Sequence, residues 1–151
     1  MYTLVRRFIK TGIAFLFVGL ALGGWMQVQR DVLARWPNPY LRSAHIHAVL
    51  VGFVMFLILG VALWLFPRPA PDDPRYTPAR VEAAYWILAT ATALRVAGEI
   101  GRAFLVVPAL QWVALVGGLG QIAGLGVYFW SMWARIRPVG SQIREARGER
   151  F

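Results

Sequence analysis

The sequence predicts an all-α fold, an integral membrane bundle of four helices with both termini in the cytoplasm. Three observations predict it. Hydrophobic residues make up 58% of the 151 residues, against roughly 45–50% in soluble domains, and a water-soluble core in so short a chain could not absorb the excess. Four apolar stretches are each long enough for a transmembrane helix, which needs about 20 residues. Basic residues gather just outside these stretches, at the headgroup level of a bilayer.

The four helices can be placed by their start signals and apolar lengths. They are predicted over about residues 8–28, 39–66, 78–104 and 108–134. The second begins after Asn38 and the third after Thr77, and each of these capping residues is followed by proline, which is favoured at the first helical position. Residues 1–138 therefore form one transmembrane domain, and residues 139–151 form a basic cytoplasmic tail.

The distribution of charge predicts the orientation of the bundle. Eleven basic residues lie at the N-terminus, in the loop between the second and third helices and in the segment from Arg135 to Arg150 that follows the fourth helix. Four lie at the opposite ends of the helices: Arg30, Arg35, Arg42 and Arg102. The positive-inside rule then places both termini on the cytoplasmic side of the cell membrane. The net charge of +9 thus indicates topology and contact with anionic lipid headgroups rather than nucleic acid. Cysteine is absent, so the chain has no thiolate metal ligand.

The chain has two histidines, His45 and His47, and both lie in an apolar run that follows Arg42. An ionisable side chain is expensive inside a membrane and marks a functional site by default, and imidazole is the commonest metal ligand. Residues two apart on a helix are separated by about 200°, so the two rings point to nearly opposite faces and cannot bind one iron together. The face of His47 is aliphatic and suits a flat apolar macrocycle, whereas the face of His45 carries small residues that suit close helix contact. The alternative is that both rings are interfacial and hydrogen-bonded to the preceding loop or to Gln27 and Gln29.

Arginines at a similar depth complete the candidate site. Arg95 lies inside the third helix, and Glu99 follows it by four residues, which predicts an ion pair on one helix face. Glu99 and Arg102 form a second candidate pair. Arg95, Arg42 or Arg102 could bind the acidic groups of a cofactor, because the planar guanidinium matches a carboxylate. A simple Arg95–Glu99 pair, or snorkelling to the interface, is the alternative.

The segment from Ser43 to Phe53, continuing to Leu65-Phe66-Pro67, resembles the second helix of the catalytic subunit of haem-copper oxidases and nitric-oxide reductases. The glycine-rich stretch from Phe15 to Gln27 is similar to the first helix of that family, and the stretch from Gly117 to Trp133 resembles helices of its short four-helix relatives. The resemblance implies haem b bound near the outer face, with His47 aligned to the haem ligand. It covers the first two helices well and the others loosely.

Two histidines are too few for the family's catalytic copper or non-haem iron centre, so oxygen or nitric-oxide reduction is not expected. The second axial ligand could be Met26, since His/Met ligation of haem occurs, although core packing is the commoner role of methionine. A partner protomer could instead donate His45 or His47 in a homo-oligomer. If the haem has no second axial ligand, the open coordination position of the iron would bind a diatomic gas.

The sequence therefore predicts a haem b protein that serves electron transfer, with a redox partner in a respiratory chain, or gas or haem binding. The rival interpretation is a cofactor-free accessory or assembly subunit of a respiratory membrane complex, because a fold does not carry its function with it.

Overall fold

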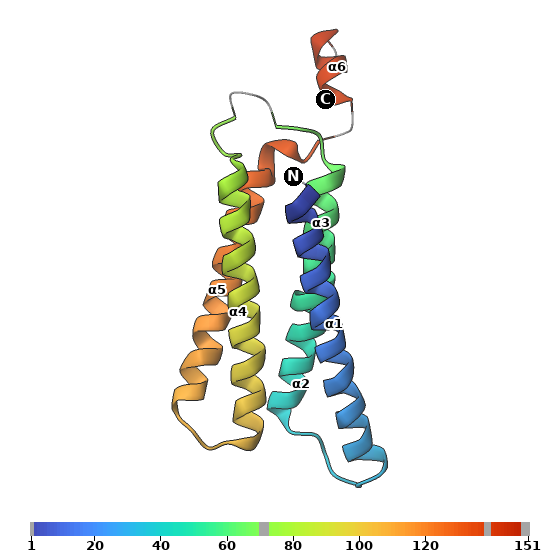
Figure 1. The fold of residues 1–151 in the computed structure, drawn as a ribbon, viewed down its shortest axis with the longest axis vertical. Coiled ribbons are helices and arrows are strands. Elements are labelled where there is room, and N and C mark those ends of the chain that lie inside the picture. The colour runs from blue at the N-terminus through green and yellow to red at the C-terminus, as the bar shows by residue number, and fades with distance from the viewer. Residues whose placement is uncertain (1, 70–72, 138–139, 149–151) are drawn as a thin grey trace.

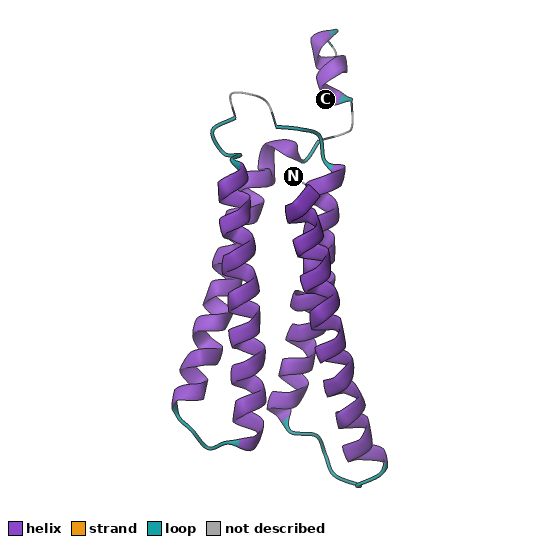
Figure 2. Ribbon diagram, in the orientation of Figure 1, coloured by secondary structure: helices purple, strands orange, loops and turns teal. Residues whose placement is uncertain are grey.

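The computed structural model describes residues 2–69, 73–137 and 140–148, and its regular structure there is entirely helical (Figures 1 and 2). The elements are α1 (Tyr2–Asp31), α2 (Pro39–Ile46), the π-helix η1 (His47–Met55), α3 (Phe56–Leu65), α4 (Pro78–Phe104), α5 (Ala109–Met132), the short 3₁₀ turn η2 (Trp133–Arg135) and α6 (Ser141–Ala146). Elements α2, η1 and α3 follow one another without a break, so the chain builds four long rods. The all-α prediction is confirmed. Of the predicted basic tail, residues 149–151 and residue 139 lie outside the described part.

The rods form two antiparallel pairs, α1 with the α2–η1–α3 rod and α4 with α5 (Figure 1). Both termini lie at one end of the bundle, together with the connection between α3 and α4, and the other two connections lie at the opposite end (Figure 1). Observed and predicted helix limits differ most in α1, which runs on through its charged ends. Arginine, lysine and glutamine are good helix formers, so the helix is longer than its apolar stretch.

The two predicted helix starts are confirmed by their caps. The side chain of Asn38 accepts a hydrogen bond from the Tyr40 amide at 2.9 Å, and the Thr77 hydroxyl accepts one from the Arg80 amide at 3.2 Å. Each cap satisfies an amide that has no partner within the helix. These caps fix the residues at which α2 and α4 begin, and therefore the positions of His47 and Arg95 along the two helices.

Three helices in the described part of the chain are long and apolar enough to cross a membrane, namely residues 3–31, 39–65 and 109–135. Helix α4 was predicted as a further span but is not among them. It is 27 residues long, yet Arg95 and Glu99 interrupt its apolar part. Helix α4 packs against its partner α5 and also against α2 and η1 of the other pair. Its buried residues are Val81, Ala84, Tyr85, Leu88, Ala91, Thr92, Val96, Gly98 and Glu99.

The apolar core is thick at the end that holds the termini and thin at the other end. The larger cluster includes Phe8, Phe56, Leu59, Leu88 and Tyr128, all of which are buried. The smaller cluster, toward the opposite end, has only three buried members, Ala44, Ala48 and Val96. Polar groups take the place of a core in this second half of the bundle.

Glycines set the distance between the paired helices. A Cβ at Gly117 would lie 2.5 Å from the Arg95 amide nitrogen and 2.8 Å from the Ala91 carbonyl, and one at Gly124 would lie 2.9 Å from the Leu88 amide nitrogen. Gly120 likewise faces Ala91, so Gly120 and Gly124, four residues apart, join α5 to α4 within the chain. Such close backbone approach is typical of helix pairs in membranes.

A second pair of glycines four residues apart, Gly19 and Gly23, also makes its contacts inside the chain. Gly19 packs against Val49, and a Cβ at Gly23 would lie 3.0 Å from Cε1 of His45. Both glycine pairs therefore hold helices of one chain together and give no support to contact between protomers.

Arg135 closes the end of the bundle that holds the termini. Its side chain is buried and donates hydrogen bonds to the carbonyl oxygens of Leu63 at 3.0 Å, Phe66 at 3.0 Å and Pro67 at 2.8 Å. These are carbonyls at the C-terminal end of α3, where a cation also meets the negative end of the helix dipole. Arg135 is one of the basic residues that predict the orientation, and the structure shows that it is also a buried capping group for another helix.

Replacing Arg135 with methionine is therefore expected to destabilise the bundle by about 2 kcal/mol, because the buried carbonyl oxygen of Leu63 and the partly buried one of Phe66 lose a charged donor. The measurement is the thermal unfolding of detergent-solubilised protein. Arg35→Met is the matched control, since Arg35 is exposed and such surface changes usually stay within about 0.5 kcal/mol. Equal stability of the two variants contradicts the capping role.

Candidate functional site

His47 is held by one ring nitrogen. Its Nδ1 lies 2.9 Å from the Ser43 carbonyl oxygen and 3.1 Å from Oε2 of Glu99 on α4. A carbonyl oxygen can only accept, so Nδ1 carries the hydrogen and Nε2 has the free lone pair when the ring is neutral. Among the described residues none is hydrogen-bonded to Nε2. The ring is thus fixed in orientation with one nitrogen left as a potential ligand.

Glu99 contacts both His47 and Arg95. Its side chain is 4% exposed; Oε1 accepts from the Ser43 hydroxyl at 2.8 Å and from Nε of Arg95 at 2.7 Å. The predicted pair of Arg95 and Glu99 is confirmed. The carboxylate therefore compensates Arg95 and orients His47 at once, as buried charges require paired and hydrogen-bonded partners.

A groove of about 430 Å³ lies beside His47. Its lining joins His47 and Arg95 to apolar residues of η1 and α5: Val51, Leu115, Gly118, Leu119, Gln121, Ile122 and Leu125. Gln121 is buried and donates to the Thr92 hydroxyl at 3.2 Å. A Cβ at position 118 would collide with the Arg95 guanidinium, so glycine there leaves room for the side chain to reach the groove.

His45 points the other way, toward α1. Its Nδ1 lies 2.8 Å from the Gly19 carbonyl oxygen, so this ring too is held through Nδ1. A separate pocket of about 320 Å³ is lined by His45, Met26 and Arg42, together with Gly23, Gln27, Arg30, Trp36 and Pro37. The predicted separation of the two histidines onto different faces is confirmed, as is the close helix contact beside His45.

The structure divides the predicted site residues into groups. His47 and Arg95 line one groove, and His45, Met26 and Arg42 line another. Within one chain, Met26 is therefore not brought to the groove beside His47.

Arg102 lines neither of these two grooves. It donates to the Tyr40 hydroxyl at 2.9 Å and lies 4.1 Å from the centre of the same ring. The predicted ion pair of Glu99 with Arg102 is not formed among the described residues. Arg102 lines a further pocket with Arg95, Glu99 and Gln111, so it lies near the outer edge of the His47 network without joining it.

His47 is also the first residue of the π-helix η1, which runs for nine residues to Met55. π-Helical turns are rare and are found mostly at functional sites. The π-helix was not predicted, because the helix limits were inferred from apolar stretches on the assumption of a regular α-helix. The widened turn follows directly after the ring that the Glu99 network holds.

Sequence reasoning missed the group that orients His47. Glu99 was considered only as a partner of Arg95 or Arg102, and Ser43 was not considered. The spacing of Ser43 and His47, four residues apart on one helix, was the available signal. The contact with Glu99 depends on which helices are neighbours, which spacing within one helix does not reveal.

No cluster of three or more histidine, aspartate or glutamate side chains suited to a metal ion occurs in the described part of the chain. A site that takes all its metal ligands from the protein therefore has no candidate there. A haem has a smaller requirement, because the porphyrin supplies the equatorial nitrogens and the protein supplies one or two axial ligands. The His47 side chain, oriented through Nδ1 beside an apolar groove, has the donor chemistry that such a group needs.

No protein-family model matches the chain, and neither a curated protein nor a solved structure is detectably similar to it.

Proposed function

We propose that this chain is a haem b-binding integral membrane protein in which Nε2 of His47 is an axial ligand of the iron. The observation that carries the proposal is the pair of contacts at Nδ1, to the Ser43 carbonyl and to Glu99. Metal-bound histidines almost always donate their other ring N–H to a carboxylate or a carbonyl, which fixes the ring and raises its basicity. The same side chain that orients His47 also holds Arg95.

The groove beside His47 suits the rest of a haem. Its walls are mostly aliphatic, from Val51 on η1 and Leu115, Leu119, Ile122 and Leu125 on α5. Arg95 lines the same groove and could pair with a propionate, with Arg102 and Arg42 as further candidates at the same end of the bundle. An apolar lining with a few placed polar groups is the usual character of a cofactor site.

A bound haem would supply a one-electron carrier or an iron position open to a gas, so electron transfer or gas or haem binding is the proposed role. The protein is a reduced relative of the catalytic subunit of haem-copper oxidases under this proposal, placed in the cell membrane with cytoplasmic termini and a respiratory-chain redox partner. A second axial ligand from a partner protomer is favoured over Met26, which faces the pocket of His45.

A cofactor-free accessory or assembly subunit is the second candidate. The observation that favours it is that both rings and two of the three candidate guanidiniums already have protein partners: His45 with Gly19, His47 and Arg95 with Glu99, and Arg102 with Tyr40. A network satisfied in this way needs no ligand for its stability.

A visible absorption spectrum of protein purified from cells with an ample haem supply separates the candidates. The haem proposal predicts a sharp Soret band that is lost in His47→Ala and largely retained in His45→Ala, because His45 faces a different helix. A colourless wild-type protein supports the accessory subunit. A Soret band lost in His45→Ala alone overturns the assignment of the ligand.

A further inference from the structure

A hollow of about 480 Å³ adjoins the groove beside His47, at the end of the bundle opposite the termini. Arg95 and Leu115 line both the hollow and the groove, so the two spaces meet there. The other residues that line the hollow are Glu99, Arg102, Gln111, Trp112 and Ala114. Along α5 the joined lining runs from Gln111 to Leu125, a rise of about 21 Å. One flat ligand can therefore have an edge in each space.

Arg102 is the cation of this hollow that has no anionic partner. Its guanidinium donates to the Tyr40 hydroxyl at 2.9 Å and lies 4.1 Å from the centre of that ring, and both of these contacts are with an uncharged group. No ion pair among the described residues includes Arg102. Its side chain is half-buried, so the charge is only partly hydrated. An acidic group of a ligand would compensate it.

Arg95 lines the same hollow, but its charge is already compensated. Its Nε donates to Oε1 of Glu99 at 2.7 Å, and the Glu99 side chain is 4% exposed. A ligand carboxylate beside Arg95 would therefore lie beside another carboxylate, and the two would repel each other. The lining holds two arginines and one glutamate, which leaves one positive charge. The ion pair leaves that charge on Arg102.

The two ends of the joined space differ in polarity. Beside Arg102, the hollow is lined by Gln111, whose exposed amide has two N–H groups to donate. At the other end, the groove is lined by aliphatic residues of α5, namely Leu119, Ile122 and Leu125. A ligand with an acidic edge and an apolar edge therefore has one preferred direction of insertion.

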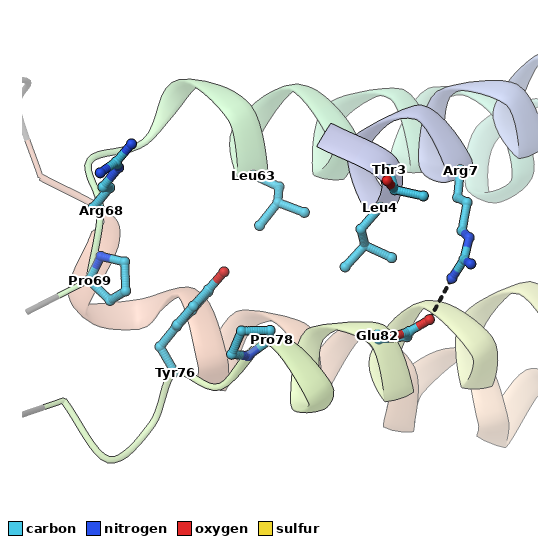
Figure 3. A pocket seen from close by; sticks show the side chains of 9 residues that line it. All are labelled: Thr3, Leu4, Arg7, Leu63, Arg68, Pro69, Tyr76, Pro78 and Glu82. Atoms are coloured by element: carbon cyan, nitrogen blue, oxygen red, sulfur yellow. Dashed lines mark hydrogen bonds and ion pairs between the residues drawn. The ribbon is translucent and has the colours of Figure 1, made fainter. Parts of the chain in front are cut away.

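The pocket at the end of the bundle that holds the termini is built differently (Figure 3). Arg7 is already paired with Glu82 across the gap between α1 and α4 (Figure 3). Leu4 and Leu63 lie between Arg7 and Arg68 (Figure 3), so one acidic group cannot meet both arginines. The hollow beside Arg102 is the better place for an acidic group.

From these features we infer that the carboxylate edge of a ligand bound at His47 lies in the hollow, paired with Arg102 and hydrogen-bonded by Gln111. Its apolar edge then lies toward Leu125. The inference rests on the proposed function, because it takes the ligand to be haem b, and it assigns the propionates to Arg102 rather than to Arg95 or Arg42. Arginine suits this role because its planar fork of donors matches a carboxylate. Arg42 lines the separate pocket of His45.

The test is a titration of the full-length protein, purified from haem-depleted cells, with iron protoporphyrin IX and with its dimethyl ester. The ester has the same ring and no acidic group, and the Soret band measures the affinity of each. The wild-type protein is expected to bind the acid about tenfold more tightly than the ester. Arg102→Gln is expected to weaken binding of the acid about tenfold and to change binding of the ester less than about twofold. Gln111→Leu is expected to weaken binding of the acid about threefold.

Arg35→Gln is the matched control, because Arg35 is exposed at the same end of the bundle and lies outside the lining of the hollow. It removes the same charge and should change the affinity for the acid by less than about twofold, and so should Arg42→Gln. Circular dichroism checks that each variant is folded. The comparison of acid with ester on the wild-type protein, and Gln111→Leu, keep the test open if Arg102→Gln is not.

The outcomes separate this inference from the proposal on which it rests. Equal affinity of the wild-type protein for the acid and the ester overturns the inference and leaves the haem proposal standing. So does a loss in Arg35→Gln or Arg42→Gln as large as that in Arg102→Gln. Binding of both porphyrins no tighter than to an unrelated membrane protein overturns the haem proposal and the inference with it.

Discussion

Replacing Glu99 with leucine is expected to lower the stability of the bundle by about 3 kcal/mol, because it leaves a partly buried cation without its anion. Arg95 is 27% exposed and Glu99 is 4% exposed, so the guanidinium cannot regain full hydration without moving. His47 and Ser43 lose the same partner. The measurement is the thermal unfolding midpoint of the solubilised protein, with the amount of folded protein in membranes as a second readout.

Glu99→Gln is the matched variant. Its amide has the shape of the carboxylate and can still accept from His47, but it carries no charge for Arg95, so a smaller loss of about 1 kcal/mol is expected. If the haem proposal holds, this variant also raises the midpoint potential, since a neutral acceptor at Nδ1 makes the axial imidazole less basic. If Glu99→Leu loses no more stability than Glu99→Gln, the result contradicts the role of the carboxylate as a bridge between Arg95 and His47.

Replacing Gly117 with leucine is expected to separate α4 from α5 and to prevent the protein from accumulating in a folded form. The first atom of any side chain there would lie 2.5 Å from the amide nitrogen of Arg95 and 2.8 Å from the Ala91 carbonyl. Both are backbone atoms, so a helix must move rather than a side chain. Overpacking of this kind typically costs 1–3 kcal/mol or more, and here it also displaces Arg95. The measurement is folded yield by size-exclusion chromatography of the solubilised protein.

Gly126→Leu is the control for this experiment. It lies on the same helix, and nothing lies within 4 Å of a Cβ built there, so the same side chain should be tolerated in this open space. Equal yields from the two variants contradict the close contact of α4 with α5.

Several features of the fold follow from local sequence alone. The caps at Asn38 and Thr77 depend on residues next to them in the chain, and so does the Arg95–Glu99 pair, four residues apart on one helix. The opposite directions of His45 and His47 follow from helix geometry. Each of these predictions needed no knowledge of which helices are neighbours.

Features that depend on contacts between helices could not be predicted. Glu99 orients His47 only because α4 packs beside α2, and Arg135 caps α3 only because α5 ends next to it. An arginine that directly follows a long apolar stretch is ordinarily a topology signal, which is why the buried role of Arg135 was missed. The glycine pairs had two possible uses, within or between chains, and spacing alone does not choose between them.

The central claim is that His47 presents Nε2 to a haem iron. Pyridine-haemochrome quantitation of haem against protein, on chain purified from haem-replete cells, tests it most directly. The account predicts haem b in a fixed ratio to the chain, either one for each chain or one shared by a pair, and none above background in His47→Ala. Haem in the wild-type protein at the level of an unrelated membrane protein purified in parallel contradicts it.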